Sequence, residues 1–329
     1  MEKTKTCRRG LKRLLAFLLS ALCLLGLLPM SAFAMEPGQT ASSWLGDQYV
    51  GSDGQHYYSP APYTYLVYNS DGTMDVRTSS GGSAYRHYML TVSDGTSHQV
   101  YCVESGIPYN TSDNTYTSES GTNSQYLNLL PAEARRGITL TAIYGWKPGA
   151  SLPVSGINED DYKMATQIIL WEYQQQLRSD PYSRHGNGHA SADQYYSVIA
   201  GRPAEKAYNW ILEQVASHST VPSFTSSSKD GAPELELKWD SEQRVYTLTV
   251  TDTNNLGIDL DLLSGSGVSV TRNGNQYTFT SKDMIMDPVT FEFRKDIPVA
   301  NDMLIWGRPG YQTMMTGASD PVSFFVKIK

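Results

Sequence analysis

The chain has 329 residues, of which 40% are hydrophobic and 11% are aromatic, and its net charge is −7 at neutral pH. This much apolar and aromatic material can build a folded core, which excludes an intrinsically disordered chain, and the length corresponds to one large or two ordinary domains. The acidic balance argues against nucleic-acid binding, because phosphate contact needs clustered Lys and Arg.

Residues 1–34 have the pattern of a secretory signal peptide. Six basic residues precede an apolar run over 14–28, and the small residues Ala32 and Ala34 frame a cleavage point. The run is shorter than the roughly 20 apolar residues that span a membrane, which favours a cleaved signal over a membrane anchor. No second apolar segment reaches spanning length, so we expect no membrane insertion after cleavage. Cleavage after Ala34 changes the net charge from −7 to −12. The mature protein is expected to be secreted or extracellular at the cell surface.

No LPxTG-type sorting signal is present, so the anchoring mode stays open. The chain ends in a strand-like run over 323–329. We therefore expect either the N-terminal piece of a longer protein or a short relative.

Strand-like segments follow a polar, Gly-rich stretch over 35–55, which predicts a flexible lead-in. Runs of β-forming residues alternate with turn signals such as Asn69-Ser70-Asp71-Gly72. We expect strands at 63–68, 74–78, 87–92 and 98–104, and then a polar loop over 110–125.

The middle of the chain predicts helices. Pro131 is suited to a first helical turn, and Gly145 ends that helix. Asn158 can cap a second helix, which runs to about Leu177 with acidic residues in its first turn. Further helical stretches are expected at 192–199 and 203–216.

A linker rich in Ser, Thr, Pro and Gly at 221–233 precedes a second β-rich region. The strands expected after it are 234–239, 245–251, 268–271, 277–280 and 289–293. The predicted fold is mixed α+β. A domain over 56–220 combines an antiparallel β-sheet region with a helical subdomain, and an all-β sandwich-like domain follows over 234–329.

Cys102 is the one cysteine that remains after signal cleavage, because Cys7 and Cys23 are removed with residues 1–34. It lies in "YCVES", near the end of a predicted strand. An odd cysteine in an exported chain suggests a reactive or intermolecular role, and a bare thiol is prone to oxidation. A free cysteine also packs as a small hydrophobe, so an inert role stays open.

Gln167 is the second unusual residue. Met164, Gln167, Ile168 and Trp171 share one face of the second helix, and three of them are large and apolar. Such a face normally packs into the core, where an unpaired carboxamide costs a few kcal/mol. Gln167 is therefore either bonded to neighbouring backbone or used chemically.

Three motifs together resemble the thioester domains of Gram-positive bacterial surface adhesins. These are "YCVES", the helix ending "LTAIYGW" over 140–146, and "ATQIILWEY" over 165–173, which corresponds to a T-Q-x-A-type helix motif. They occur in the family's order, within about residues 60–217.

The resemblance implies an internal thioester between Cys102 and Gln167, formed with loss of ammonia. It implies an adhesin that captures a lysine amine of a host surface or extracellular-matrix protein in a single turnover. Such a protein is not an enzyme in the usual sense, and it needs no cofactor or metal.

The resemblance leaves the supporting residues open. Tyr101, Glu104 and Thr166 are candidates for catalysing bond formation, and Trp171 belongs to the helix motif. The sequence departs from the family at Ile169, where the motif has alanine. This larger side chain puts efficient bond formation in question.

Two alternatives remain from the residues. Cys102 with His185 or His189 is a possible secreted cysteine hydrolase. An inert Cys102 leaves a non-covalent structural or binding module. The same two histidines in "HGNGH" are a weak metal pattern without a cysteine partner. The final strand has no Asn, so no Lys–Asn cross-link is expected in the sandwich.

Overall fold

The computed structural model describes residues 35–109, 111, 115–296 and 302–329. The predicted signal peptide at 1–34 lies outside the described residues, and so do residues 110 and 112–114 of the predicted polar loop. The described helices and strands all belong to one compact unit, Pro37–Lys329. Within the described residues, no helix is both long and apolar enough to cross a membrane.

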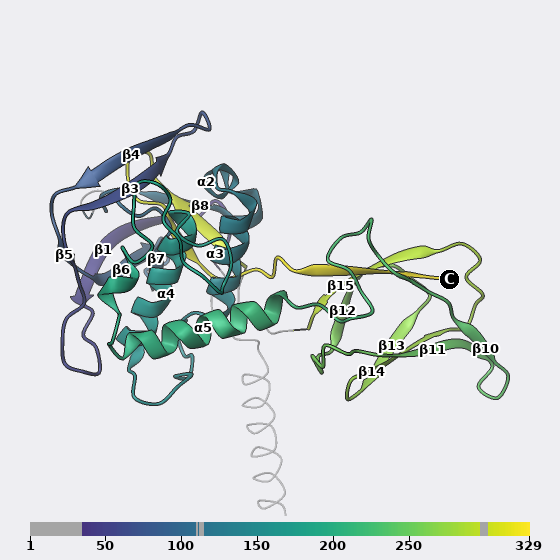
Figure 1. The fold of residues 1–329 in the computed structure, drawn as a ribbon. Coiled ribbons are helices and arrows are strands. Elements are labelled where there is room, and N and C mark those ends of the chain that lie inside the picture. Colours follow the sequence, from purple (N-terminus) through teal and green to yellow (C-terminus); the bar gives the residue numbers. More distant parts are fainter. Residues whose placement is uncertain (1–34, 110, 112–114, 297–301) are drawn as a thin grey trace, which may run out of the picture. The chain divides into compact units, whose positions relative to one another are not determined.

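Six strands close into a barrel in the order β1-β6-β7-β17-β16-β8. Figure 1 labels β1, β6, β7 and β8 of this barrel. Each pair of neighbours is antiparallel. The strands are β1 (Thr40–Gln48), β6 (Arg86–Val92), β7 (Ser97–Cys102), β8 (Tyr116–Ser120), β16 (Leu304–Gly307) and β17 (Met314–Thr316). Closure leaves no free sheet edge, so the ladder of β7 is paired on both sides.

The segment 35–55, expected as a flexible lead-in, instead contributes strand β1. Its register with β6 pairs Ala41 with Val92 and Leu45 with Tyr88. Burial alternates from exposed Thr40 to buried Ser43, as it does in a strand with one face on a core. The inward residues Ala41 and Ser43 are small, so hydrophobicity alone did not reveal this alternation.

Two small antiparallel sheets complete the first β region. β3 (Tyr63–Tyr68) pairs with β4 (Met74–Ser79), and the turn between them passes through Gly72 at φ +82°. β2 (Tyr58–Ser59) pairs with β5 (Ser83–Ala84). The hairpin predicted from the Asn-Ser-Asp-Gly turn is therefore present.

The helical part consists of α2 (Gln125–Leu129), α3 (Ala132–Tyr144), α4 (Glu159–Gln174) and α5 (Ala204–Ser219). Two short 3-10 turns are η1 (Gly121–Asn123) and η2 (Tyr196–Val198). η2 is all that forms of the helix expected over 192–199. α4 contacts α3, α5 and strand β7.

α4 is a central helix with a defined start. The Asn158 side chain accepts from the Asp161 N–H at 2.9 Å, and Asp161 accepts from the Asn158 N–H at 2.8 Å, which is a capping box. Asp161 also receives the Ser52 N–H at 3.0 Å, which ties this end to the segment after β1. Every residue from Asp161 to Gln174 is buried. The predicted apolar face thus understates the burial of a helix that is enclosed on all sides.

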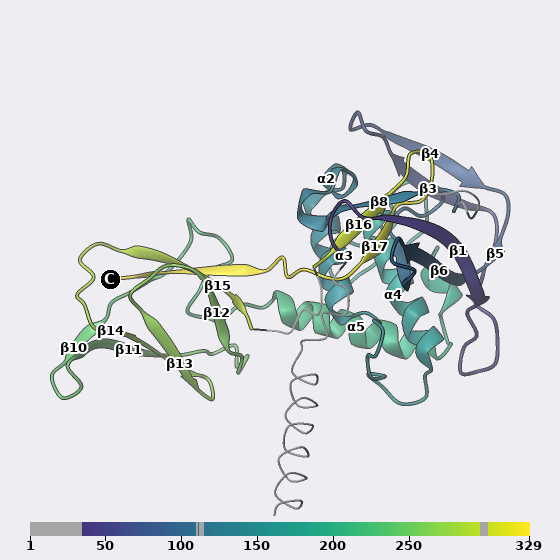
Figure 2. The same cartoon turned by 180° about the vertical axis from the view of Figure 1, so that it is seen from behind.

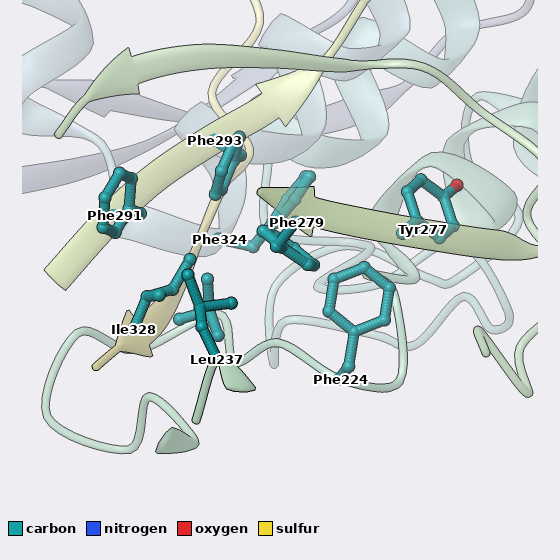
Figure 3. Packing of buried hydrophobic residues seen from close by; sticks show 9 residues of the cluster. Phe224, Leu237, Tyr277, Phe279, Phe291, Phe293, Phe324 and Ile328 are labelled. Atoms are coloured by element: carbon teal, nitrogen blue, oxygen red, sulfur yellow. The ribbon is translucent and has the colours of Figure 1, made fainter. Parts of the chain in front are cut away.

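The second β region is a sandwich of two four-stranded sheets, β10-β11-β14-β13 and β12-β15-β18-β9. Its strands are β9 (Glu234–Leu235), β10 (Lys238–Asp240), β11 (Val245–Thr251), β12 (Leu260–Ser264), β13 (Ser269–Asn273), β14 (Gln276–Ser281), β15 (Val289–Lys295) and β18 (Ser323–Ile328). Figure 3 shows the aromatic core between the sheets, with Phe279 of β14 near Phe293 of β15 and Phe324 of β18. The mixed α+β fold with a sandwich is as expected.

The strand pairing differs from the expected division in one respect. β16 and β17 lie between the sandwich strands β15 and β18 in sequence, but they pair with β8 and β7 of the barrel (Figure 2). Part of the predicted sandwich range 234–329 therefore belongs to the barrel. Sequence periodicity gives no signal for this, because a strand of three or four residues fits either sheet.

Candidate functional site

Cys102 is the last residue of β7, inside the closed barrel. It pairs with Met314 of β17, and the next residue, Val103, donates its N–H to the Thr313 carbonyl at 3.0 Å. The side chain of Cys102 is fully buried. The backbone carrying the thiol is therefore held by a strand that follows more than 200 residues later.

Gln167 lies on α4 with its carboxamide across the backbone of Cys102. Gln167 Oε1 accepts from the Cys102 N–H at 2.9 Å, and Gln167 Nε2 donates to the Cys102 carbonyl at 2.7 Å. Both ends of this buried polar group are thus satisfied, as the energetics of burial require. The structure brings the two predicted residues into direct contact across 65 positions of sequence.

Two other glutamines fasten the helical region to strands in the same way. Gln175 bonds both the N–H and the carbonyl of Leu66, and Gln194 does so with Thr64. The contact is therefore a general device of this fold. Gln167 differs from these two glutamines because the residue that it bonds, Cys102, carries a thiol.

Burial raises the pKa of the Cys102 thiol to about 12. Two N–H groups lower this pKa, because they stabilise the thiolate. The Glu104 backbone N–H donates to Cys102 Sγ at 3.4 Å, and the Trp171 indole lies close enough to favour the thiolate. The indole nitrogen has no well-aligned partner of its own among the described residues. A buried thiol with this raised pKa is protonated near neutral pH, so a neighbouring group must take its proton before the sulfur can attack a carbonyl carbon.

Glu104 follows the cysteine and is held by the returning strand. Glu104 Oε2 accepts both the N–H of Thr313 at 2.9 Å and its hydroxyl at 2.7 Å. Burial raises the pKa of Glu104, and the two Thr313 bonds partly offset this by stabilising the ionised form. Of the predicted supporting residues, Glu104 thus contacts the sulfur through its backbone N–H, and Trp171 lies beside it.

Tyr101 and Thr166 instead organise the segment around Trp146. Tyr101 donates its hydroxyl to the Trp146 carbonyl at 2.9 Å, and Thr166 Oγ1 accepts from the Trp146 N–H at 3.0 Å. The close approach requires Gly145, where a Cβ would lie 2.4 Å from Thr166 Cγ2. This explains why the Tyr-Gly-aromatic and Thr-Gln motifs occur together: they meet where α3 crosses α4.

Ile169 and the two histidines have clear positions. Ile169 is fully buried. His185 and His189 are exposed in a loop, where the hydrogen bonds of this segment run to Leu177, Gly186 and Asn187. Neither contact set includes Cys102, which weighs against the hydrolase alternative. Among the described residues, no group of three His, Cys, Asp or Glu side chains could hold a metal ion.

A cavity of about 400 Å³ lies beside the site, with Trp171 in its wall. Six of its 16 lining residues carry aromatic rings, and the ring centroids of Tyr85 and Tyr195 each lie within 5.5 Å of that of Trp171. Gln312 also lines it. Sequence reasoning did not single out Gln312 or Thr313, because only the return of β17 to the barrel brings them here.

Comparison with known proteins gives one family and two solved structures. Residues 99–217 match the family model described as "Thioester domain". The thioester domain of the Staphylococcus aureus TIE protein has 15% identity and a TM-score of 0.46, over 88% of this chain and 97% of that one. The pilus-presented adhesin Spy0125 (Cpa), in its P1 form, has 10% identity and a TM-score of 0.30, with the same coverage. No curated protein matches. This chain therefore contains a thioester-domain segment at residues 99–217.

Proposed function

We propose that Cys102 and Gln167 form an internal thioester. Cys102 Sγ attacks the Gln167 carboxamide carbon, the C–N bond breaks, and the thiol proton leaves with the amide nitrogen as ammonia. The observation that carries this proposal is the carboxamide held across the Cys102 backbone at 2.9 and 2.7 Å. Such positioning makes the step effectively intramolecular.

The surroundings of the two groups favour this chemistry. The Cys102 N–H already donates to Gln167 Oε1, where negative charge develops in the tetrahedral intermediate, so it serves as an oxyanion donor. Glu104 is our candidate for moving the proton from sulfur to the leaving nitrogen. It lies near the thiol and is buried enough to have a raised pKa.

We further propose that the thioester captures a primary amine, as an adhesin does with a lysine of a host surface or extracellular-matrix protein. The amine nitrogen bonds to the Gln167 carbonyl carbon, and Cys102 leaves as a thiol. The Glu104 N–H and the Trp171 indole support the departing sulfur. Each molecule reacts once, so the protein acts by covalent binding rather than by turnover. The predicted signal peptide agrees with work outside the cell.

The intact mass of the purified mature protein tests the bond. We expect a deficit of one ammonia in the wild type and no deficit in Cys102→Ala or Gln167→Ala. Gln194→Ala is the matched control, because Gln194 makes the same two-sided contact with a residue that has no thiol. A full mass in the wild type, with Gln still at position 167 after digestion, would exclude the thioester. Glu at that position would instead indicate a bond that had formed and hydrolysed.

Amine capture is tested separately by incubating the protein with a lysine-containing peptide. The expected adduct carries the whole peptide on residue 167 and frees one alkylatable thiol at Cys102. A peptide-hydrolysis product without an adduct would support the hydrolase alternative.

A further inference from the structure

The cavity beside Trp171 has a wall of mainly uncharged residues, which limits the kinds of ligand that it can bind. Its ring-bearing wall residues are Tyr63, Tyr85, Tyr88, Tyr109, Trp171 and Tyr195. Among its described lining residues there is no Asp or Glu, and the one cation is Arg86, which is exposed and bonded to the Gly46 carbonyl. A slot of this kind accepts an alkyl chain, and no carboxylate in its wall holds an amine in the charged form.

The cavity lies next to the proposed reacting atoms. Trp171 belongs to its wall and also influences the Cys102 thiol. Ser105, three residues after Cys102, also lines the cavity, and so does Gln312, whose neighbour Thr313 accepts the N–H of Val103. Cys102 itself is fully buried, so a reactant must arrive through neighbouring space.

Two buried polar atoms of the wall residues, the Trp171 indole nitrogen and Gln312 Oε1, have no hydrogen-bond partner among the described residues. Gln312 is 7% exposed, and its Oε1 has none among the described residues. The same side chain interacts with the Tyr88 hydroxyl, and the Gln312 backbone N–H donates to the Pro108 carbonyl at 3.1 Å. Gln312 is thus held in place from both sides with a bare acceptor. An unsatisfied buried carbonyl gains most from a ligand that donates an N–H.

We propose that this cavity is the access cleft for a primary amine on an unbranched alkyl chain, and that Gln312 Oε1 accepts a hydrogen bond from the incoming nitrogen. The inference rests on the proposed thioester. The cleft orients the neutral amine, its nitrogen bonds to the Gln167 carbonyl carbon, the C–S bond breaks, and the amine proton passes to the Cys102 sulfur. Gln312 is a specificity residue that acts in capture and not in formation of the bond.

The test measures aminolysis of the full mature protein by Nα-acetyl-lysine methylamide, counted only for molecules whose intact mass shows the ammonia deficit. Gln312→Leu removes the acceptor at nearly constant volume, and we expect it to slow aminolysis by roughly three- to tenfold, the effect of one hydrogen bond. Gln99→Leu is the control, because Gln99 is partly buried in β7 but bonds Tyr49 and His87 away from the cleft. It should leave the rate within about twofold.

A second pair of variants tests the route without touching Gln312. Ser83 is an exposed residue of the cleft wall, and Ser80 is exposed but outside it. Ser83→Trp should slow lysine aminolysis, while Ser80→Trp should not. Isopropylamine, which is branched at the reacting carbon, should react more slowly than n-butylamine in the wild type.

The outcomes separate the two levels of proposal. A wild-type protein without the ammonia deficit would remove the thioester and this inference together. A protein with the deficit, in which Gln312→Leu and Ser83→Trp both react at the wild-type rate, would overturn the cleft assignment and leave the thioester standing.

Discussion

At the residue scale, the buried polar groups of the site fall into two classes, those with hydrogen-bond partners and those without. Gln167 is fully satisfied by the Cys102 backbone, whereas the Trp171 indole N–H and Gln312 Oε1 lack partners among the described residues. Satisfied groups fix geometry, and unsatisfied ones are available to a reacting sulfur or a ligand. A core glutamine and a reactive glutamine are therefore not opposed interpretations here, because the same contact serves both.

Thr313 provides the first prediction, because it holds Glu104 by two hydrogen bonds to one oxygen. Thr313→Val removes the hydroxyl bond that stabilises the ionised carboxylate, so the pKa of Glu104 should rise further. If ionised Glu104 also relays the amine proton to the Cys102 sulfur during capture, the acidic limb of the aminolysis pH profile should shift toward higher pH. Rates measured from pH 5 to 9 by intact mass check this.

Thr316→Val is the matched control for this prediction. Thr316 ends strand β17, which Thr313 directly precedes. It is 7% exposed like Thr313, and it accepts a hydrogen bond from Trp306 instead. Both variants should lose about 1 kcal/mol of unfolding free energy. Only Thr313→Val should move the profile, and an equal shift in the two would assign the effect to general loosening of β17.

At the element scale, the decisive contact is the crossing of α3 and α4. Gly137 and Gly145 on and after α3 have no space for a side chain, since a Cβ would lie 2.2 Å from the Tyr173 ring and 2.4 Å from Thr166 respectively. The crossing places Thr166 against Trp146, and Gln167 follows directly. The helix cap at Asn158 sets where α4 begins and hence which residue faces β7.

Gly145→Ala should therefore destabilise the protein by about 1–3 kcal/mol, because its Cβ would overlap Thr166 Cγ2 and the Thr141 carbonyl. Displacement of α4 should also lower the fraction with the ammonia deficit. Denaturant unfolding and intact mass measure the two effects. Gly81→Ala is the control, since nothing lies within 4 Å of its added Cβ. Equal stability of the two variants would contradict the proposed tight crossing.

At the scale of the whole molecule, most of the sandwich strands are inserted in sequence between two groups of barrel strands. The chain leaves after α5, forms β9 to β15, and returns through β16 and β17 to complete the barrel beside Cys102 before β18. The family match at residues 99–217 thus contains Cys102 and Gln167 but not β17, which holds the Cys102 strand. We infer that residues 302–316 are needed for a complete site.

Lys295 links the end of β15 to α5, because its Nζ donates to the Ser217 carbonyl at 3.0 Å. Burial lowers the pKa of Lys295 to about 8, with Asp320 and Asp252 partly opposing. The unfolded lysine titrates near 10.5, so between these values the unfolded state binds more protons than the folded state. The unfolding free energy should therefore rise with pH over this interval, by about 2 kcal/mol at most between pH 7.5 and 9.5.

Lys295→Met should remove this rise, and the exposed Lys238→Met should keep it. The unfolding free energies of the two variants are compared by denaturant unfolding at pH 7.5, 8.5 and 9.5. These pH values lie below the range in which most tyrosines ionise. If Lys295→Met retains the full pH dependence, the titrating group is elsewhere.

Local chemistry in the sequence determined a large part of this protein. The hairpin at Asp71-Gly72, the cap at Asn158 and the helices over 132–144 and 204–219 follow from turn, capping and periodicity rules that act within a few residues. Cys102 and Gln167 were also identifiable, because a lone thiol in an exported chain and a carboxamide among apolar helix residues are each anomalous.

Tertiary structure alone decided what surrounds that pair. β1, built on small inward residues, and β16 and β17, with three or four residues each, carry too little periodicity to be assigned from sequence. Their place depends on barrel closure, a long-range pairing in which Met314 meets Cys102 across 212 positions. Only that pairing brings Thr313 to Glu104 and Gln312 to the cleft, because contacts between distant segments have no signature in the local residue pattern.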